Sequence, residues 1–186
     1  EPCTVEDNGD DSFTMTCPDG TSVTWTPEGG GGGQGVFVEC DPNHTILQGS
    51  FVIQNEIDLA HASCFTEFTG TLTVDASHLR AVHLPNLVRV GAALNIRGGL
   101  LEELGMPALT QVGDRLNINN IPRMQELTFP ALRDVGENVS ILGQGNTILG
   151  TIHLPLLETV GGSRLQINTW DLLFSLNLDS LSGQGN

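Results

Sequence analysis

The chain of 186 residues contains no lysine, and its seven basic residues are all arginine, against 22 acidic residues and a formal net charge of −15. Without lysine there is no phosphate loop of the Walker type and no amine for Schiff-base chemistry. Nucleic acids and anionic membrane surfaces bind clustered cations, whereas this chain carries charge of the opposite sign. We therefore expect neither of them as a partner.

Long apolar runs are also missing, since no stretch approaches the roughly 20 apolar residues that a membrane-spanning helix needs. We expect no insertion into a membrane.

Cysteine is confined to four positions in the first third of the chain, and none of them forms a close CxxC pair: Cys3, Cys17, Cys40 and Cys64. An even number at wide spacing predicts two disulfides and an oxidising compartment. The chain begins at Glu1 without a methionine, as it would after removal of an export signal. We expect a secreted protein, either extracellular or on the cell surface.

Residues 1–41 differ from the rest, because they hold nine acidic residues and no basic one. The turn sequences Asn8-Gly9 and Asp19-Gly20 predict short β-hairpins in this segment. Cys3 and Cys17 flank the first turn, which leaves Cys40 to pair with Cys64, although four cysteines allow three connectivities. The glycine tract at 29–33 predicts a flexible hinge before a second unit at 42–186.

An internal repeat dominates residues 42–186. Prolines recur at Pro85, Pro107, Pro130 and Pro155, at spacings of 22, 23 and 25 residues. Six residues after each proline stands a glycine: Gly91, Gly113, Gly136 and Gly161. The prolines fit corners between strands, where a missing N–H is harmless, and the glycines fit the following corners, where a positive φ can be required.

Apolar residues align in columns around these prolines. One column, three residues before each proline, contains Val82, Leu104, Leu127, Ile152 and Leu176. Short alternating segments follow the glycines, such as Leu94-Asn95-Ile96 and Leu116-Asn117-Ile118, and alternation with period two is typical of strands. A repeat of this length cannot bury its own apolar face, so successive copies must stack around one core.

The predicted fold is therefore all-β: a right-handed β-helix or solenoid of about six coils, preceded by a disulfide-stapled β-hairpin segment. A helical leucine-rich horseshoe fits less well, because the segments between strands are too short and too rich in valine and glycine for a helix behind each strand.

The repeated strings VHLPNLVRVG, LGMPALTQVG, LTFPALRDVG and IHLPLLETVG, with GSFVIQNEIDL and FTGTLTV before them, resemble the receptor L domain. That family, similar over about residues 49–182, consists of right-handed β-helices found in growth-factor receptors and in bacterial exported proteins. The opening segment resembles the leader of bacterial surface proteins. The resemblance implies the fold and leaves the ligand open, since function depends on sites and not on the fold.

Candidates for metal chemistry are weak. Asp7, Asp10 and Asp11 crowd one turn and could offer oxygens to calcium, but the spacing of an EF-hand is absent, which favours a solvated acidic turn. We expect no other cofactor. The trio Asp58, His61 and Cys64, in a predicted short helix at 58–65, has zinc-like spacing, but its cysteine is needed for the disulfide.

Catalytic and modification sites are equally weak. His83 and His153 occupy equivalent outward positions three coils apart, too far to share a metal. Glu102 and Glu103 are adjacent, so their side chains are expected to diverge instead of facing each other across a substrate. We interpret these residues as solvated and the protein as non-enzymatic. Asn43 and Asn138 are N-glycan acceptors if the source is eukaryotic.

One surface remains as a binding candidate. The middle residues of the successive strands predict a flat, uncharged column, which we call the polar stripe: Thr73, Asn95, Asn117, Ser140 and Gln166.

Two functions follow from the predicted surfaces. The protein could assemble with itself into a fibre or surface layer through the open ends of the solenoid and the N-terminal segment. Alternatively, it could recognise another surface protein or a glycan through the polar stripe. A lyase-type β-helix enzyme ranks last, because the columns do not place acids and a basic residue together on one face.

Overall fold

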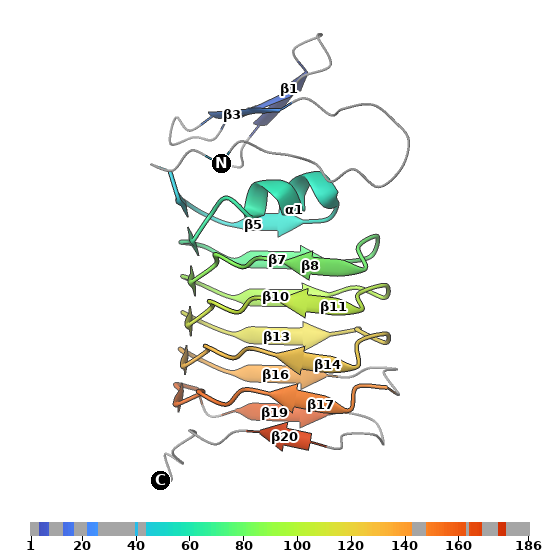
Figure 1. Cartoon of the computed structure of the whole chain (residues 1–186). Coiled ribbons are helices and arrows are strands. Elements are labelled where there is room, and N and C mark those ends of the chain that lie inside the picture. Colours follow the sequence, from blue (N-terminus) through green and yellow to red (C-terminus); the bar gives the residue numbers. More distant parts are fainter. Residues whose placement is uncertain are drawn as a thin grey trace.

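The structure, a computed structural model, describes residues 4–7, 13–16, 22–25, 40, 44–142, 148–162, 164–168 and 175–177. Within these residues the chain forms a right-handed solenoid of stacked parallel strands, which confirms the predicted fold class (Figure 1). The strands of successive coils form three faces, and in the first coil a helix takes the place of the third-face strand.

The first face is a parallel sheet in which each strand pairs with the strand of the next coil. Its strands, in spatial order, are β5 (Phe51–Ile53), β7 (Leu72–Asp75), β10 (Leu94–Arg97), β13 (Leu116–Asn119), β16 (Val139–Leu142) and β19 (Leu165–Asn168). Leu94 lies opposite Leu72 on one side and Leu116 on the other, so identical positions of the repeat stack directly. The predicted register of this face is confirmed.

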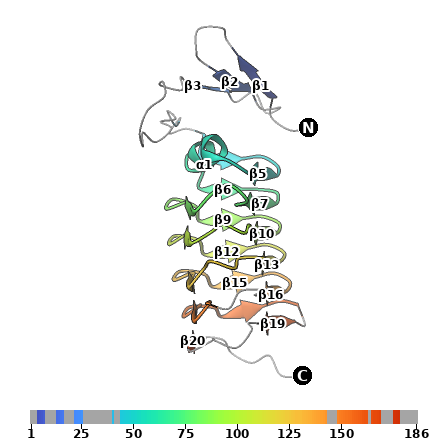
Figure 2. The ribbon, with the colours of Figure 1, turned by 90° about the vertical axis from the view of Figure 1, so that its right-hand side faces the viewer.

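The second face is a parallel sheet of two-residue strands (Figure 2). These are β4 (Ile46–Leu47), β6 (Glu67–Phe68), β9 (Arg89–Val90), β12 (Gln111–Val112), β15 (Asp134–Val135) and β18 (Thr159–Val160). The valine five residues after each proline lies on these strands and points inward, for example Val90, Val112 and Val135.

The third face is interrupted. It consists of a pair, β8 (Ala81–His83) and β11 (Glu103–Gly105), and a separate group, β14 (Glu126–Thr128), β17 (Thr151–His153) and β20 (Ser175–Asn177). Although β10 pairs with β13 and β12 with β15 in the same two coils, no hydrogen-bonded ladder joins β11 to β14.

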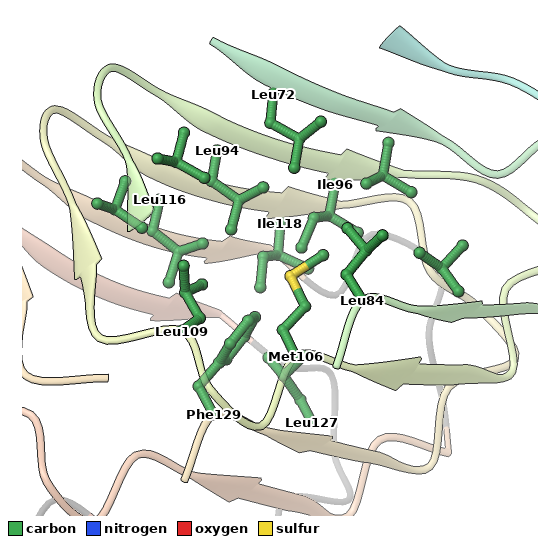
Figure 3. Close-up of a cluster of buried hydrophobic side chains, with 14 of the residues drawn as sticks. Leu72, Leu84, Leu94, Ile96, Met106, Leu109, Leu116, Ile118, Leu127 and Phe129 are labelled. Atoms are coloured by element: carbon green, nitrogen blue, oxygen red, sulfur yellow. The ribbon is translucent and has the colours of Figure 1, made fainter. Parts of the chain in front are cut away.

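The predicted apolar columns form one continuous core (Figure 3). Leu72, Leu94 and Leu116 from the first face meet Met106 and Phe129, which stand just before the prolines. All of these side chains are at most 1% exposed. Burying a leucine of this kind stabilises the fold by about 1.5–3 kcal/mol before its entropy is counted.

One position of the predicted columns packs against the core but is less buried than the others. Leu104 pairs with Val82, and Leu127 pairs with Ile152, but the break in the third face leaves Leu104 without Leu127 as a neighbour in the ladder. Leu104 is only half-buried, whereas Val82 and Leu127 are fully buried.

The prolines occupy the corners after the third face, as predicted. A hydrogen bond closes each turn, from the residue two positions after the proline to the residue just before it. Around Pro85, the N–H of Leu87 donates to the carbonyl of Leu84 at 3.3 Å. The same bond joins Leu109 to Met106 at 3.2 Å. Proline fits the second position of such a turn because its fixed φ matches the turn and its missing N–H is not used.

The repeated glycines have a different cause from the one expected. Among described glycines only Gly49 and Gly98 have a positive φ. The glycines of the repeat are needed because the backbones of adjacent coils approach too closely for a side chain: a Cβ on Gly113 would lie 1.9 Å from the carbonyl oxygen of Gly91. On Gly136 it would lie 1.8 Å from that of Gly113.

A helix, α1 (Glu56–Ala62), follows β5 in the first coil, at the place where later coils have their third-face strand. Asn55 caps it by accepting hydrogen bonds from the N–H groups of Ile57 and Asp58 at 2.9 and 3.0 Å. The helix begins two residues before the predicted segment 58–65 and ends before that segment does. Just after it, Cys64 is bonded to Cys40 with an S–S distance of 2.00 Å, which confirms the predicted pair.

The N-terminal segment contains an antiparallel sheet, as the turn sequences predicted. Its order is β1 (Thr4–Asp7), β2 (Phe13–Thr16), β3 (Ser22–Trp25). The Cys3–Cys17 pair, the glycine hinge, the candidate calcium residues Asp10 and Asp11, and the glycan acceptor Asn43 lie outside the described residues; Asp7 is the last residue of β1.

Candidate interaction surfaces

The polar stripe lies where the sequence placed it, on the outer side of the first face. Thr73 pairs with Asn95, Asn95 with Asn117, Asn117 with Ser140, and Ser140 with Gln166, each in the neighbouring strand. All five side chains are half-buried by their neighbours in the sheet. The Nδ2 of Asn117 donates a hydrogen bond of 3.0 Å to the Oδ1 of Asn95, so the middle of the stripe is held in a defined orientation.

A second outward column runs beside the polar stripe, two residues further along each strand. It contains Asp75, Arg97, Asn119, Leu142 and Asn168. Its charges are concentrated at one end, where Arg97 contacts Asp75 at 2.9 Å. The hydrogen bond from the Ser77 hydroxyl is the main cause that lowers the pKa of Asp75; burial opposes it, and the nearby guanidinium of Arg97 lowers the pKa further. The centre of the face is therefore rich in uncharged amides.

The arginines are engaged within the chain. Six of the seven form ion pairs: Arg80 and Arg123 with Glu102, Arg89 with Glu67, Arg97 with Asp75, Arg115 with Glu137, and Arg133 with Glu158. These are exposed pairs between coils and contribute little to stability one by one. Together they affect the surface charge more than the stability, because they neutralise the arginines while unpaired acidic residues remain in excess.

A hollow of about 710 Å³ opens on the third face, at the break between β11 and β14. It is lined by His83, Glu102, Glu103, Leu104, Arg123, Gln125, Glu126, Thr128 and Ile148. A second hollow of about 290 Å³ continues it past Pro85, Pro107 and Pro130, and the two share His83, Leu104 and Thr128. We call the two together the β11–β14 groove.

The groove lies beside a connection that differs in length from those of the preceding coils. Five residues connect the first face to the third in the coils that contain β8 and β11 (76–80 and 98–102), whereas six do so in the coil that contains β14 (120–125). The additional residue lies near Asn120, which takes the left-handed conformation with φ of 51°. The strands of the other two faces stay in register across these coils, so the longer connection coincides with a break that is confined to the third face.

Glu102 and Glu103 line the same groove together with Glu126, and both are exposed and contact different partners, as the interpretation of divergent, solvated side chains predicted. Glu102 accepts hydrogen bonds from Arg80 at 2.7 Å and from Arg123 at 3.2 Å. Glu103 lies 3.5 Å from the ring of His83. The sequence signal that marks this place is the one extra residue in the connection 120–125.

The remaining candidate residues do not form a metal site within the described parts of the chain, where no group of three His, Cys, Asp or Glu side chains is placed to hold an ion. Cys64 of the zinc-like trio is in the disulfide. Its His61 is 3% exposed, and burial lowers the pKa of the imidazole, against an opposing effect of Asp58. His83 and His153 are on β8 and β17, with β11 and β14 between them.

Comparison with protein-family models, with curated proteins and with solved structures found no match in any of the three. In the described part of the chain, no helix has the length and hydropathy to cross a bilayer.

Proposed function

We propose that the protein is a non-enzymatic recognition module of the extracellular space or cell surface, which binds another macromolecule, a protein or a glycan, through the polar stripe. The observation that carries the proposal is the exact register of five uncharged polar side chains over neighbouring strands. Four of the five lie on strands that are paired on both sides, and Gln166 lies on the end strand β19, which is paired with β16, so binding costs little ordering of the surface.

Amide side chains suit this role because each offers both a donor and an acceptor. The bond between Asn117 and Asn95 leaves part of this capacity for a ligand. The disulfide between Cys40 and Cys64 supports an oxidising location. The resemblance to the receptor L domain, which is itself part of this proposal, supports a role in extracellular recognition.

The test compares two identical substitutions at different places. Asn117→Arg puts a large cation in the middle of the polar stripe, whereas Asn86→Arg changes an exposed corner residue. The labelled wild-type protein is screened on a glycan array and on cells of its source, and affinities of both variants are measured for the ligand found.

We expect Asn117→Arg to weaken binding at least about tenfold, because it blocks a polar contact at the centre of the site, and Asn86→Arg to leave it unchanged. Wild-type affinity of Asn117→Arg would contradict the proposal. An equal loss of affinity in both variants would contradict it as well.

Self-association is a second candidate, favoured by the end strands. β5 and β4 each pair on one side only among the described strands, and their outward residues Val52 and Ile46 are 45% and 44% exposed. Because all strands of the solenoid are parallel, the last coil of one copy could pair with the first coil of the next and build a filament. Negative-stain microscopy of the protein from its native source should then show filaments, and images of monomers alone would exclude this candidate.

A further inference from the structure

The break in the third face leaves backbone groups directed into the β11–β14 groove. On β11 the N–H of Glu103 donates to Arg80 at 3.0 Å and the carbonyl of Gly105 accepts from Leu84 at 2.8 Å, so both residues face β8. Alternate residues of a strand direct their backbone groups to opposite sides. Leu104, between them, therefore directs its N–H and C=O towards β14.

The facing edge of β14 has the same property. The carbonyl of Gln125 accepts from Thr151 at 3.3 Å, and the N–H of Phe129 donates to His153 at 3.0 Å, so this set of backbone groups faces β17. Glu126 and Thr128 alternate with it and direct their N–H and C=O groups towards β11. The groove is thus bordered by two strand edges that the sheet does not pair.

The side chains that line the groove combine negative charge with apolar surface. Three glutamates line it against one arginine, and that arginine is bound to Glu102. The carboxylate of Glu126 accepts a hydrogen bond of 2.9 Å from the neutral hydroxyl of Thr128, and no described cationic side chain forms an ion pair with it. Apolar surface lies beside these carboxylates: Leu104 is half-buried, and Ile148 is 42% exposed.

We propose that the β11–β14 groove binds an extended peptide segment of a partner protein through one basic side chain. The aliphatic stem of that arginine or lysine lies on Leu104 and Ile148, and its cationic head reaches the carboxylates of Glu126 and Glu103. The second hollow, lined in part by Pro85, Pro107 and Pro130, takes an apolar neighbour of the basic residue. The unpaired backbone groups of Leu104 and Thr128 bind the peptide backbone.

Charge complementarity identifies the partner as a different protein. A net charge of −15 makes two copies of this chain repel each other, and six of its seven arginines are held in ion pairs of their own. The groove is also on the third face, away from the polar stripe on the first, so loss of one site leaves the other intact.

The experiment uses the full chain and a defined probe, an acetylated and amidated hexapeptide with a central Arg-Leu pair in a Gly/Ser background. Its counterpart with citrulline keeps the shape of the arginine side chain and removes the charge. Both are titrated at low salt while amide signals of the ¹⁵N-labelled protein are followed by NMR. We expect saturable shifts at Leu104, Glu126 and Thr128 with the arginine peptide and at least tenfold weaker binding of the citrulline peptide.

Two variants that each remove one negative charge separate a specific site from general attraction. Glu126→Gln should weaken binding of the arginine peptide about tenfold, the loss expected for one charge-assisted hydrogen bond. Glu158→Gln, beside the second face, should leave it within twofold. The proposal is overturned if both variants weaken binding equally, if the citrulline peptide binds as well, or if the shifts map away from the groove.

Discussion

At the scale of single residues, the glycines of the repeat are the tightest constraint on the fold. Each stands where the backbone of one coil lies against a carbonyl group of the preceding coil, and no side chain fits between them. Their spacing in the sequence indicated a corner, but spacing alone cannot distinguish a required positive φ from a close approach of two backbones. The structure decides for the close approach.

Gly113→Ala tests this constraint. Its Cβ would lie 1.9 Å from the carbonyl oxygen of Gly91, so the coils must separate, and we expect the free energy of unfolding in urea to fall by about 3 kcal/mol. Gly99→Ala is the matched control, because a Cβ there meets nothing within 4 Å, and it should change the free energy by less than about 0.5 kcal/mol. Equal effects of the two substitutions would refute the explanation.

His61 predicts a pH dependence of stability. Burial lowers the pKa of its imidazole in the folded state, so the unfolded chain binds more protons near the ordinary histidine pKa of 6.5. Stability from this residue is therefore complete above pH 6.5 and decreases as the pH falls below it. Urea midpoints at pH 7.5 and 5.5 should differ more for the wild type than for His61→Leu.

His78→Gln is the control for this effect, since His78 is exposed. It should keep the pH dependence of the wild type. If His61→Leu keeps it as well, the imidazole of His61 is not its source.

At the scale of elements, the third face is interrupted beside a connection that is one residue longer than those of the two preceding coils. The two neighbouring faces hold the coils together, so the displacement of β14 remains local and the core beneath it stays closed, with Leu127 and Phe129 fully buried. Only Leu104 loses cover. A solenoid can therefore form a groove without losing the stacking that stabilises it.

Hydrogen exchange should detect the interrupted ladder. The amides of Glu126 and Thr128 face the groove, whereas that of Leu127 faces β17 in a paired ladder. We expect the first two to exchange at least about tenfold faster than the amide of Leu127, because protection requires a hydrogen bond. Similar protection of all three amides by NMR would show that β14 is paired on both sides.

At the scale of the whole molecule, charge governs association. The arginines of the described residues mostly bridge neighbouring coils, and the excess of acids gives the chain a calculated isoelectric point of about 4.3. Copies therefore repel one another at neutral pH, and a self-assembled form requires salt or a lower pH to screen or remove the charge.

This predicts how solubility and association depend on conditions. Light scattering should be lowest at pH 7 and low salt, and it should rise as the pH approaches 4.3, where the net charge vanishes. A protein that forms filaments at pH 7 in low salt would show that strand pairing at the solenoid ends outweighs the repulsion.

The pairing of Cys40 with Cys64 was one of three connectivities that the sequence left open, and the structure decided for it. The sequence by itself determined the solenoid, the register of the first face and the polar stripe. It could do so because these features follow from a local period: each repeat presents the same residues to its neighbours, and stacking is the only way to bury them. Leu72, Leu94 and Leu116 are aligned in the sequence before they are aligned in space.

Only the tertiary structure decided where the stack departs from its period. The extra residue near Asn120 could have been absorbed at a corner, in a bulge or by a shift of one strand, and the choice depends on how firmly the other two faces hold each coil. That balance opens the β11–β14 groove, leaves Leu104 half-buried and brings Glu103 and Glu126 to one site. Such a site depends on contacts between coils, which no single repeat encodes.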